Sequence, residues 1–331
     1  MDFVITWVND KDPAWRADYE KYSLIETGEK RECRFRDWDN LHYWFRGVEK
    51  FAPWVDRVFL IVASPSQLPE WLNTDHPKLR TVFHGEYIPE ELLPTFSPFP
   101  IEMFLHLIPD LSEQFVYFND DFFIVNHIKP ERFFRKGLPV DLCAMNAYSS
   151  GSLATNCMCN LEIINRNFNK RNVMRSHIFK WFSPANGKHL VRNFLLMWWP
   201  EFTGFYDHHL PQPLLKSTLT KVWNREGAAV FNSLKYRFRT GLENTQYLYR
   251  YWQLMENRFT VGNVEADSVA YHPATEAQLN NMTDAIRKQK RNIIVVNDNE
   301  RLSFLDFDDV KIRTCKAFDS ILPDRSLFER N

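Results

Sequence analysis

Short apolar runs alternate with helix-patterned segments along the first third of this 331-residue chain. Four runs rich in β-branched and aromatic residues predict buried strands, at residues 3–8, 57–62, 79–83 and 114–118. Apolar residues at helical spacing predict helices over 41–51 and from 97 to 108, with Asp37 and Ser97 as their N-caps. Strands that alternate with helices predict an α/β fold with a Rossmann-like, mainly parallel sheet, which binds ligands at the strand ends.

The sequence pattern changes after about residue 150, where Asn-rich and helix-patterned segments replace the alternating strands and helices. We expect residues 1–150 to form the α/β core and residues 151–260 to form a mostly helical subdomain that carries His209 and Arg239. Residues 261–331 are expected to return to the core, through a strand at 292–296 and a C-terminal helix.

Composition excludes several classes of protein. Hydrophobic residues make up 44% of the chain, which is enough for a substantial core, and the net charge of -1 gives no overall field that would attract nucleic acid. No apolar stretch is long enough to span a membrane, and the N-terminus lacks the features of a signal peptide. Five cysteines, an odd number, favour reduced thiols and a cytoplasmic location.

Acidic residues end two of the predicted strands. Asn119, Asp120 and Asp121 lie between two apolar runs, and Asn297 and Asp298 follow the strand at 292–296. Strand ends of an open sheet converge on one crevice, where carboxylates can hold Mg²⁺ or Mn²⁺ and so clamp a diphosphate. The alternative for each motif is an ordinary turn, because Asn and Asp are common turn formers.

One histidine and two arginines are candidates for the chemistry. His209 lies in a proline-rich segment that can fix its imidazole as a general base, although a packed or surface histidine is the alternative. Arg237 and Arg239 alternate with aromatic residues, so on a strand they would share a face and could grip phosphate oxygens. A solvated pair of arginines is the alternative.

A charged segment precedes the first predicted helix. Arg34, Arg36 and Asp37 lie at a helix start, where a phosphate or a general base could sit, and a plain N-cap with an ion pair is the alternative. The chain has no glycine-rich phosphate loop, no nucleophile elbow and no zinc helix. With ten glycines in all, metal and arginine would have to bind any phosphate.

A basic and aromatic stretch covers residues 166–199. It contains seven Lys or Arg residues and no Asp or Glu, with Phe and Trp interleaved. Amphipathic helices with snorkelling basic side chains are one explanation. The other is a surface for an anionic, lipid-linked acceptor at the membrane.

These motifs, in this order, resemble the Stealth family of sugar-phosphate transferases. Four blocks carry the resemblance: residues 2–13; residues 34–37 on through 49–55, 93–97, 101–102 and 118–121; residues 209–211 with Arg239 and 246–247; and residues 296–298. Two departures from the family pattern, at residues 38–43 and 62–67, leave the identity of the donor sugar open.

The resemblance implies a nucleotide-sugar transferase fold, a UDP-sugar donor such as UDP-GlcNAc, and Mg²⁺ or Mn²⁺. It implies transfer of a hexose or N-acetylhexosamine 1-phosphate to a hydroxyl of a glycan acceptor, which is lipid-linked in our interpretation. The product is a phosphodiester in a capsular or cell-surface polysaccharide, and UMP is released. The enzyme would act in the cytoplasm, with peripheral contact to the inner membrane.

Roles follow from the motifs and the resemblance together. Asp37, His209 and Arg239 are the expected catalytic residues, with His209 or Asp37 as the base. Asp120, Asp121 and Asp298 are the expected metal ligands. The expected substrate-binding residues are Thr6, Trp7, Asn9, Asp12, Arg34, Arg36, Asn119, Arg237 and Asn297. Two rival functions stay open, a metal-dependent glycosyltransferase that releases UDP and a non-catalytic carbohydrate-binding protein.

Overall fold

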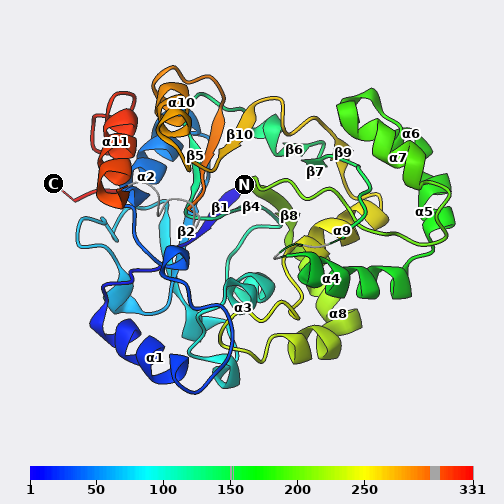
Figure 1. Cartoon of the computed structure of the whole chain (residues 1–331), viewed down its shortest axis with the longest axis horizontal. Coiled ribbons are helices and arrows are strands. Elements are labelled where there is room, and N and C mark those ends of the chain that lie inside the picture. The colour runs from blue at the N-terminus through cyan, green and yellow to red at the C-terminus, as the bar shows by residue number, and fades with distance from the viewer. Residues whose placement is uncertain (150, 152, 299–305, 331) are drawn as a thin grey trace.

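A five-stranded sheet with the order β3-β2-β1-β4-β8 forms the centre of the computed structural model, which describes residues 1–149, 151, 153–298 and 306–330 (Figure 1). Its strands are β1 (Asp2–Thr6), β2 (Val58–Val62), β3 (Leu79–Phe83), β4 (Gln114–Phe118) and β8 (Gln212–Leu215). The first four are parallel to their neighbours, whereas β8 runs antiparallel to β4. The prediction of a mainly parallel α/β sheet is therefore confirmed.

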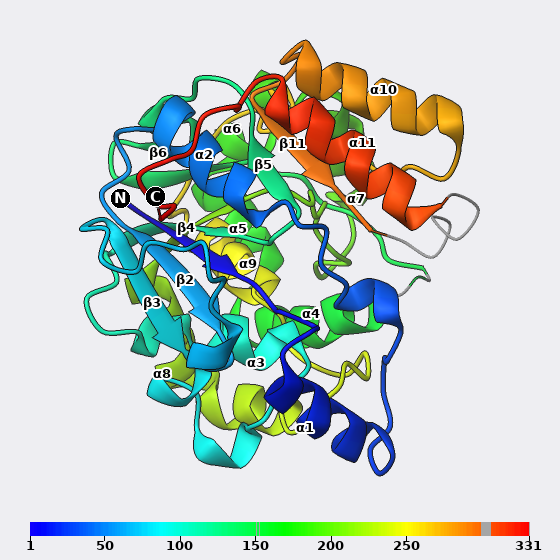
Figure 2. The same cartoon turned by 90° about the vertical axis from the view of Figure 1, so that its left-hand side faces the viewer.

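Helices cover both faces of this sheet (Figure 2). The helices of the described residues are α1 (Pro13–Ser23), α2 (Leu41–Phe51), α3 (Pro98–Met103), α4 (Ala154–Asn167), α5 (Lys170–Ser176), α6 (Ile178–Trp181), α7 (Leu190–Leu196), α8 (Lys216–Ser233), α9 (Tyr247–Met255), α10 (Glu276–Arg287) and α11 (Phe307–Asp319), of which α5–α7 lie at one end of the molecule, away from the sheet (Figure 1). Alternate strand residues point to opposite faces. Phe3 and Ile5 pack with α2, α10 and α11, while Val4 between them packs with α3, α4, α8 and α9.

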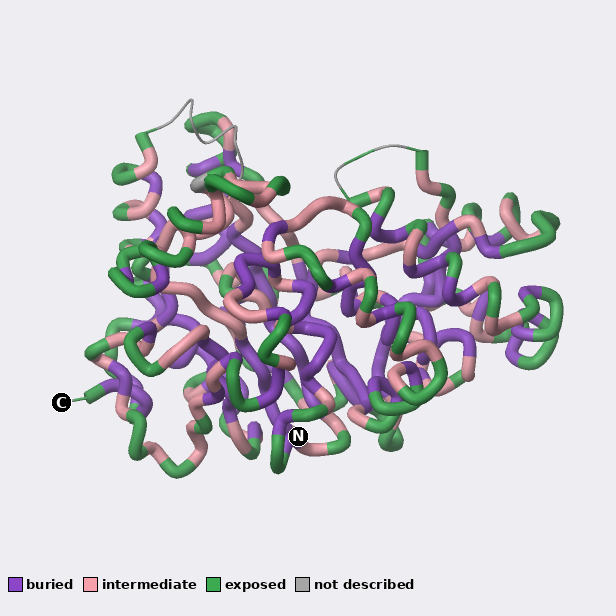
Figure 3. The backbone as a smooth tube through the Cα atoms, turned by 90° about the horizontal axis from the view of Figure 1, so that it is seen from below, coloured by how far each residue is buried: buried purple, intermediate pink, exposed green. Residues whose placement is uncertain are grey.

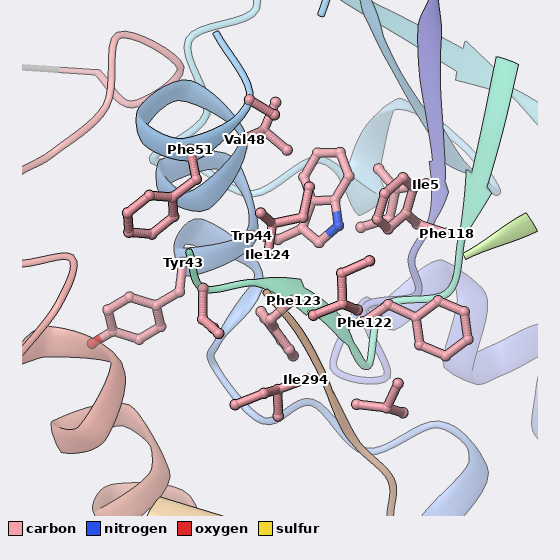
Figure 4. Close-up of a cluster of buried hydrophobic side chains, with 14 of the residues drawn as sticks. Ile5, Tyr43, Trp44, Val48, Phe51, Phe118, Phe122, Phe123, Ile124 and Ile294 are labelled. Atoms are coloured by element: carbon pink, nitrogen blue, oxygen red, sulfur yellow. The ribbon is translucent and has the colours of Figure 1, made fainter. Parts of the chain in front are cut away.

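Two smaller sheets complete the fold. One has the order β10-β11-β5 and is built from β10 (Ser268–Tyr271), β11 (Ile293–Val296) and β5 (Phe122–Ile124). The other has the order β6-β7-β9 and is built from β6 (Phe134–Arg135), β7 (Leu138–Asp141) and β9 (Thr260–Val261). Figure 4 shows the core where β5 meets α2, with Phe123 and Ile124 lying beside Trp44. The chain passes from β4 to β5 through residues 119–121 alone.

Local structure differs from the sequence prediction at two places. Asp37 does not cap α2: the N-cap is Asn40, and the Asp37 carboxylate accepts a hydrogen bond from the Asp39 N–H instead (3.0 Å). Residues 236–239 are not a strand, because Phe238 is buried against Phe96 and Tyr19 and the backbone on either side of it is irregular. Ser97 does cap α3, as predicted.

The segment 151–260 contributes α4 through α9, but it also places β8 in the main sheet beside β4. The final segment adds β10, β11 and the C-terminal helix α11. In the part of the chain that the structure describes, no helix combines the length and apolar character that crossing a bilayer requires.

Candidate active site

The candidate active site lies at the carboxyl ends of β1 and β4, which are adjacent and parallel. The chain continues from β1 to β2 on one side, whereas β4 lies on the other side, so the two strands flank a topological switch point. Ligands of open α/β sheets bind at such a point. Trp7 follows β1 and Asn119 follows β4, and both line the same cavity.

Three connected cavities meet at this point. The first has a volume of about 220 Å³ and is lined by Thr6, Trp7 and Tyr117, among others. The second is a wide cleft of about 990 Å³ that reaches Tyr148 and Arg192, and the third is a small acidic cavity of about 170 Å³. Arg34, His209 and Arg239 line all three cavities, so a ligand in any of them reaches the same cationic centre.

Two adjacent carboxylates face this centre. Asp120 borders open space but lies deep among protein atoms, and desolvation together with the charge of Asp121 raises its pKa to about 7. One oxygen of Asp121, Oδ1, is buried without a hydrogen-bond partner. Unsatisfied buried carboxylate oxygens indicate a missing positive charge. The pair therefore fits a divalent cation.

The protein supplies few other ligands for such a cation. Across the described residues, no group of three or more His, Cys, Asp or Glu side chains is arranged to hold a metal ion. Mg²⁺ often takes only one or two carboxylates from the protein and completes its shell with water and substrate phosphate. Asp120 and Asp121 are suited to that kind of site.

Asp298 reaches the acidic cavity but is already engaged. Its carboxylate accepts hydrogen bonds from the Arg36 guanidinium and from the Trp38 Nε1–H (3.1 Å). A metal ion would have to compete with Arg36 for these oxygens. The role of Asp298 as a metal ligand stays a prediction. In the structure, the ion pair of Arg36 and Asp298 links the end of β11 to the segment before α2.

His209 is positioned by β8, which begins three residues later. Its Nε2 lies 3.2 Å from Asp121 Oδ2, and its ring meets that of Phe122 edge-on at 4.8 Å. Desolvation disfavours the imidazolium, but the hydrogen bond to Asp121 and the nearby carboxylates outweigh it and raise the pKa of His209. The preceding His208 is buried and bonds Asp141 instead (3.0 Å).

Arg239 and Arg34 lack carboxylate partners at hydrogen-bond distance. The Arg239 guanidinium lies 5.7 Å from the centre of the Phe99 ring, and no acceptor within the described residues bonds it. Its pKa is lowered by desolvation and by the like charge of Arg34. The Arg34 Nε is buried and unbonded, with Glu29 at 4.0 Å. Two guanidinium groups that lack a carboxylate at hydrogen-bond distance and line one cavity are suited to bind an anion.

The neighbouring Arg237 behaves differently. It forms an ion pair with Glu26 (2.8 Å), lies over the Tyr22 ring and lines none of the three cavities. The structure therefore separates two arginines that the sequence pattern had grouped together.

The remaining predicted residues divide into two groups. Asp37 and Asn297 line the acidic cavity, where desolvation and contact with Asp39 raise the pKa of Asp37 to about 6. Asn9 and Asp12 line none of the three cavities. The Asp12 carboxylate caps α1 (2.7 Å to Trp15 N), and the Asn9 backbone is bridged by the Gln67 side chain. These two residues shape the loop after β1.

Glu102 lies in the second family block, but the sequence analysis assigned it no role in the site. It is buried on α3, lines the first cavity and accepts a hydrogen bond from the Tyr117 hydroxyl (3.1 Å). The same hydroxyl lies 3.1 Å from Thr6 Oγ1. Desolvation raises the pKa of Glu102 to about 7. A single acidic residue among the apolar residues of α3 was the available signal.

Comparison with known proteins extends over the whole chain. Residues 1–26 match Stealth protein CR1, conserved region 1, and residues 34–140 match Stealth protein CR2, conserved region 2. The capsular polysaccharide phosphotransferase WcwK of Streptococcus pneumoniae is 38% identical and aligns over 100% of this chain and 98% of its own length.

Two further relatives show the same extent of similarity. The receptor polysaccharide phosphotransferase WefC of Streptococcus oralis is 36% identical over 99% of each chain. The exopolysaccharide phosphotransferase cps2G of Lactiplantibacillus plantarum is 36% identical over 100% of this chain and 96% of its own length. With both conserved regions in order and full-length relatives above a third identical, the chain is an enzyme that belongs to the Stealth family of phosphotransferases.

Proposed function

We propose that this enzyme transfers a sugar 1-phosphate from a UDP-sugar to a hydroxyl of a glycan acceptor. The product is a phosphodiester in a capsular or cell-surface polysaccharide, and UMP is released. The observation that carries this proposal is the meeting of three cavities at Arg34, His209 and Arg239. The relatives, which are capsular and exopolysaccharide phosphotransferases, support it.

The first cavity suits the nucleoside of the donor. It lies beside the end of β1, and the rings of Trp7, Phe35 and Tyr117 line it. The diphosphate would then extend toward Arg239 and Arg34, whose guanidinium groups have no carboxylate in hydrogen-bond contact. The wide cleft is left for the acceptor glycan, which needs the larger volume of about 990 Å³.

Asp120 and Asp121 would hold Mg²⁺ or Mn²⁺ at this site. When bound, such an ion neutralises charge on the diphosphate and on the departing UMP. The protein's own contribution is to keep two carboxylates side by side at the end of β4, next to the cationic centre.

His209 is suited to accept the proton of the acceptor hydroxyl, and Asp37 in the acidic cavity is the alternative base. The oxygen of the acceptor forms a bond to the β-phosphorus, while the bond from that phosphorus to the bridging oxygen breaks. UMP leaves with the bridging oxygen. Arg239 stabilises the charge on the equatorial oxygens, as positioned arginines do in other phosphoryl transfers.

One assay tests the proposal against its rivals. The enzyme is incubated with UDP-sugars, Mg²⁺ and an acceptor glycan, the released nucleotide is identified, and the product is examined by phosphorus NMR. UMP together with a phosphodiester signal is the expected result. Release of UDP would instead indicate a glycosyltransferase that breaks the sugar–oxygen bond, and binding without turnover across a broad panel of donors would indicate a carbohydrate-binding protein.

We further propose that the acceptor is lipid-linked and that the enzyme works at the cytoplasmic face of the membrane. The absence of acidic residues between 166 and 199, where seven basic residues lie among aromatic ones, supports this location.

A further inference from the structure

Helices α5, α6 and α7 form the end of the molecule opposite the C-terminus (Figure 1), where much of the backbone belongs to exposed residues (Figure 3). A group of large apolar side chains is exposed on these elements and just after α7. We call it the α7 surface, and it consists of Phe179, Val191, Phe194, Leu195, Trp198 and Trp199. Phe179, Leu195 and Trp198 expose 89%, 72% and 82% of their surface. Scattered apolar residues are normal on protein surfaces, but a contiguous group marks an interaction site.

The outward face of α7 is apolar, whereas its inward side carries the buried polar residue Asn193 together with the partly buried Leu196. Val191, Phe194 and Leu195 follow the spacing i, i+3, i+4, which places them on one face of α7, and that face is exposed. Trp198 lies in the turn that follows the helix and is also exposed. The buried face carries Asn193, whose side chain bonds Met145 N (2.7 Å), Cys143 O (2.7 Å) and Trp181 O (2.6 Å). These three bonds fix the rotation of the helix, so the apolar face is held outward.

Two contacts keep this end of the chain ordered. The ammonium group of Lys170 donates to the carbonyl oxygens of Leu196 (2.6 Å) and Trp199 (2.9 Å) just past the end of α7. The ring of Phe194 meets that of Phe182 edge-on at 5.2 Å, which joins α7 to the segment after α6. The apolar side chains are therefore presented on a fixed scaffold.

Basic side chains on α5 lie near the α7 surface, because Lys170 at the start of α5 bonds the carbonyl oxygens of Leu196 and Trp199. Glu201, two residues after Trp199, is an exposed acidic residue in the same region. Arg171 and Arg175 are exposed, and within the described residues no acidic side chain forms an ion pair with either. The chain as a whole carries a net charge of -1, so this excess is local. Exposed Trp and Phe beside unpaired Arg is the combination that binds the boundary of an anionic bilayer, where rings enter the headgroup layer and cations meet lipid phosphates.

The α7 surface also borders the mouth of the active site. Arg192, next to Val191 on α7, lines the wide cleft together with His209 and Arg239. A second copy of this chain is a poorer occupant of the surface, because a symmetric contact would bring the basic residues of both copies together.

We propose that the α7 surface docks the enzyme on an anionic lipid bilayer, with Phe179, Trp198 and Trp199 in the headgroup layer and Arg171 and Arg175 against lipid phosphates. The docking stands on this geometry alone. Its role in bringing a lipid-linked acceptor to the cleft rests on the proposed function.

Flotation with vesicles tests the docking. Purified full-length protein is mixed with vesicles of equal parts phosphatidylglycerol and phosphatidylcholine, or of phosphatidylcholine alone. We expect flotation on the first only, weakened by salt. W198S/W199S should weaken binding at least roughly tenfold, because two large side chains lose their burial. R171Q and R175Q should each weaken it about fivefold.

The matched control is Leu24→Ser, which replaces a residue that is 86% exposed near the end of α1. The docking is overturned by failure to float on anionic vesicles, by an equal loss in Leu24→Ser, or by light scattering that shows a dimer which W198S/W199S dissociates. UMP release with a water-soluble acceptor should be the same in W198S/W199S and the unaltered enzyme. If flotation holds but UMP release fails in the unaltered enzyme, the docking stands and the proposed function falls.

Discussion

The active site and the α7 surface both contain groups whose interactions the protein itself leaves incomplete. In the active-site cavities these groups are charges, since Arg34 and Arg239 have no carboxylate in hydrogen-bond contact and Asp121 Oδ1 is unbonded. On the α7 surface they are apolar side chains that point outward. Each arrangement is unfavourable for the protein alone and becomes favourable with a ligand. The chemistry of these groups therefore distinguishes the two ligands that we propose: phosphate and a cation in the active site, and lipid at the α7 surface.

Arg239 should show the largest effect. Arg239→Ala is expected to reduce sugar-phosphate transfer about 10³-fold or more, because a positioned arginine stabilises the charge on the transferring group. Steady-state UMP release measures this, and Arg237→Ala is the matched control. Arg237 pairs with Glu26 outside the cavities, so its loss should reduce the rate less than about tenfold. An equal loss of transfer rate in both variants would contradict the assignment of Arg239, and not Arg237, to the active site.

His209→Ala should show the next largest effect. We expect it to reduce the rate of sugar-phosphate transfer about 10²- to 10⁴-fold, the usual contribution of a general base. The rate of the unaltered enzyme should rise with pH as the imidazole loses its proton, and the variant should lack this limb. Asp37→Asn is the comparison. If His209→Ala keeps both the rate and the pH limb while Asp37→Asn loses them, the base is Asp37.

The acidic pair predicts stabilisation by a cation. Mg²⁺ at about a hundredfold excess over its Kd should raise the free energy of unfolding by about 2.7 kcal/mol. Thermal unfolding with and without Mg²⁺ measures this without any substrate. Asp120→Asn and Asp121→Asn should lose most of the shift, whereas Asp298→Asn should keep it if Arg36 is the true partner of that carboxylate.

Glu102 predicts a pH dependence of stability. Its pKa is about 7 in the folded enzyme against 4.5 in an unfolded chain, so the folded state holds the proton more tightly. Stability contributed by this group is therefore lost as the pH rises from about 4.5 to 7 and stays constant above that. Glu102→Gln should be similar to the unaltered enzyme at low pH and more stable by about 2–3 kcal/mol at pH 8, by denaturant unfolding. A constant difference across that range would contradict it.

The smallest effect is expected at Trp198. Trp198→Ser should change the free energy of unfolding by less than about 0.5 kcal/mol, because the side chain is exposed in the isolated protein. On the inward face of the same helix, Asn193→Ala should destabilise by about 1–3 kcal/mol, since buried backbone partners lose their bonds. A large loss of stability in Trp198→Ser would show that the residue is part of the fold.

The strands of the core could be predicted because apolar runs buried on both sides carry their own signal. The parallel arrangement then placed Asn119 and Asp120 beside Trp7 at one sheet edge, and the structure brings these residues to one cavity. The arrangement of His209 was harder, because it depends on β8 pairing with β4 across about a hundred residues.

Three other features could not be predicted, because they depend on contacts between residues far apart in the sequence: the orientation of α7, the separation of Arg237 from Arg239, and the pKa of Glu102. Periodicity marks the apolar stripe of α7 but not the direction it faces, which Asn193 decides. Spacing grouped Arg237 with Arg239, yet burial of Phe238 and the distant Glu26 separated them. Glu102 gains its perturbed pKa only from the packing around α3.

The short link between β4 and β5 has a consequence for how the enzyme is made. Asp120 and Asp121 stand between the main sheet and the second sheet, and among the described residues β5 pairs with β11 alone, at residues 293–296. During synthesis the main sheet has all its strands once residue 215 exists, but β5 has nothing to pair with until nearly the whole chain has been translated. The carboxylates therefore gain their final setting late in synthesis, once β11 is available to pair with β5.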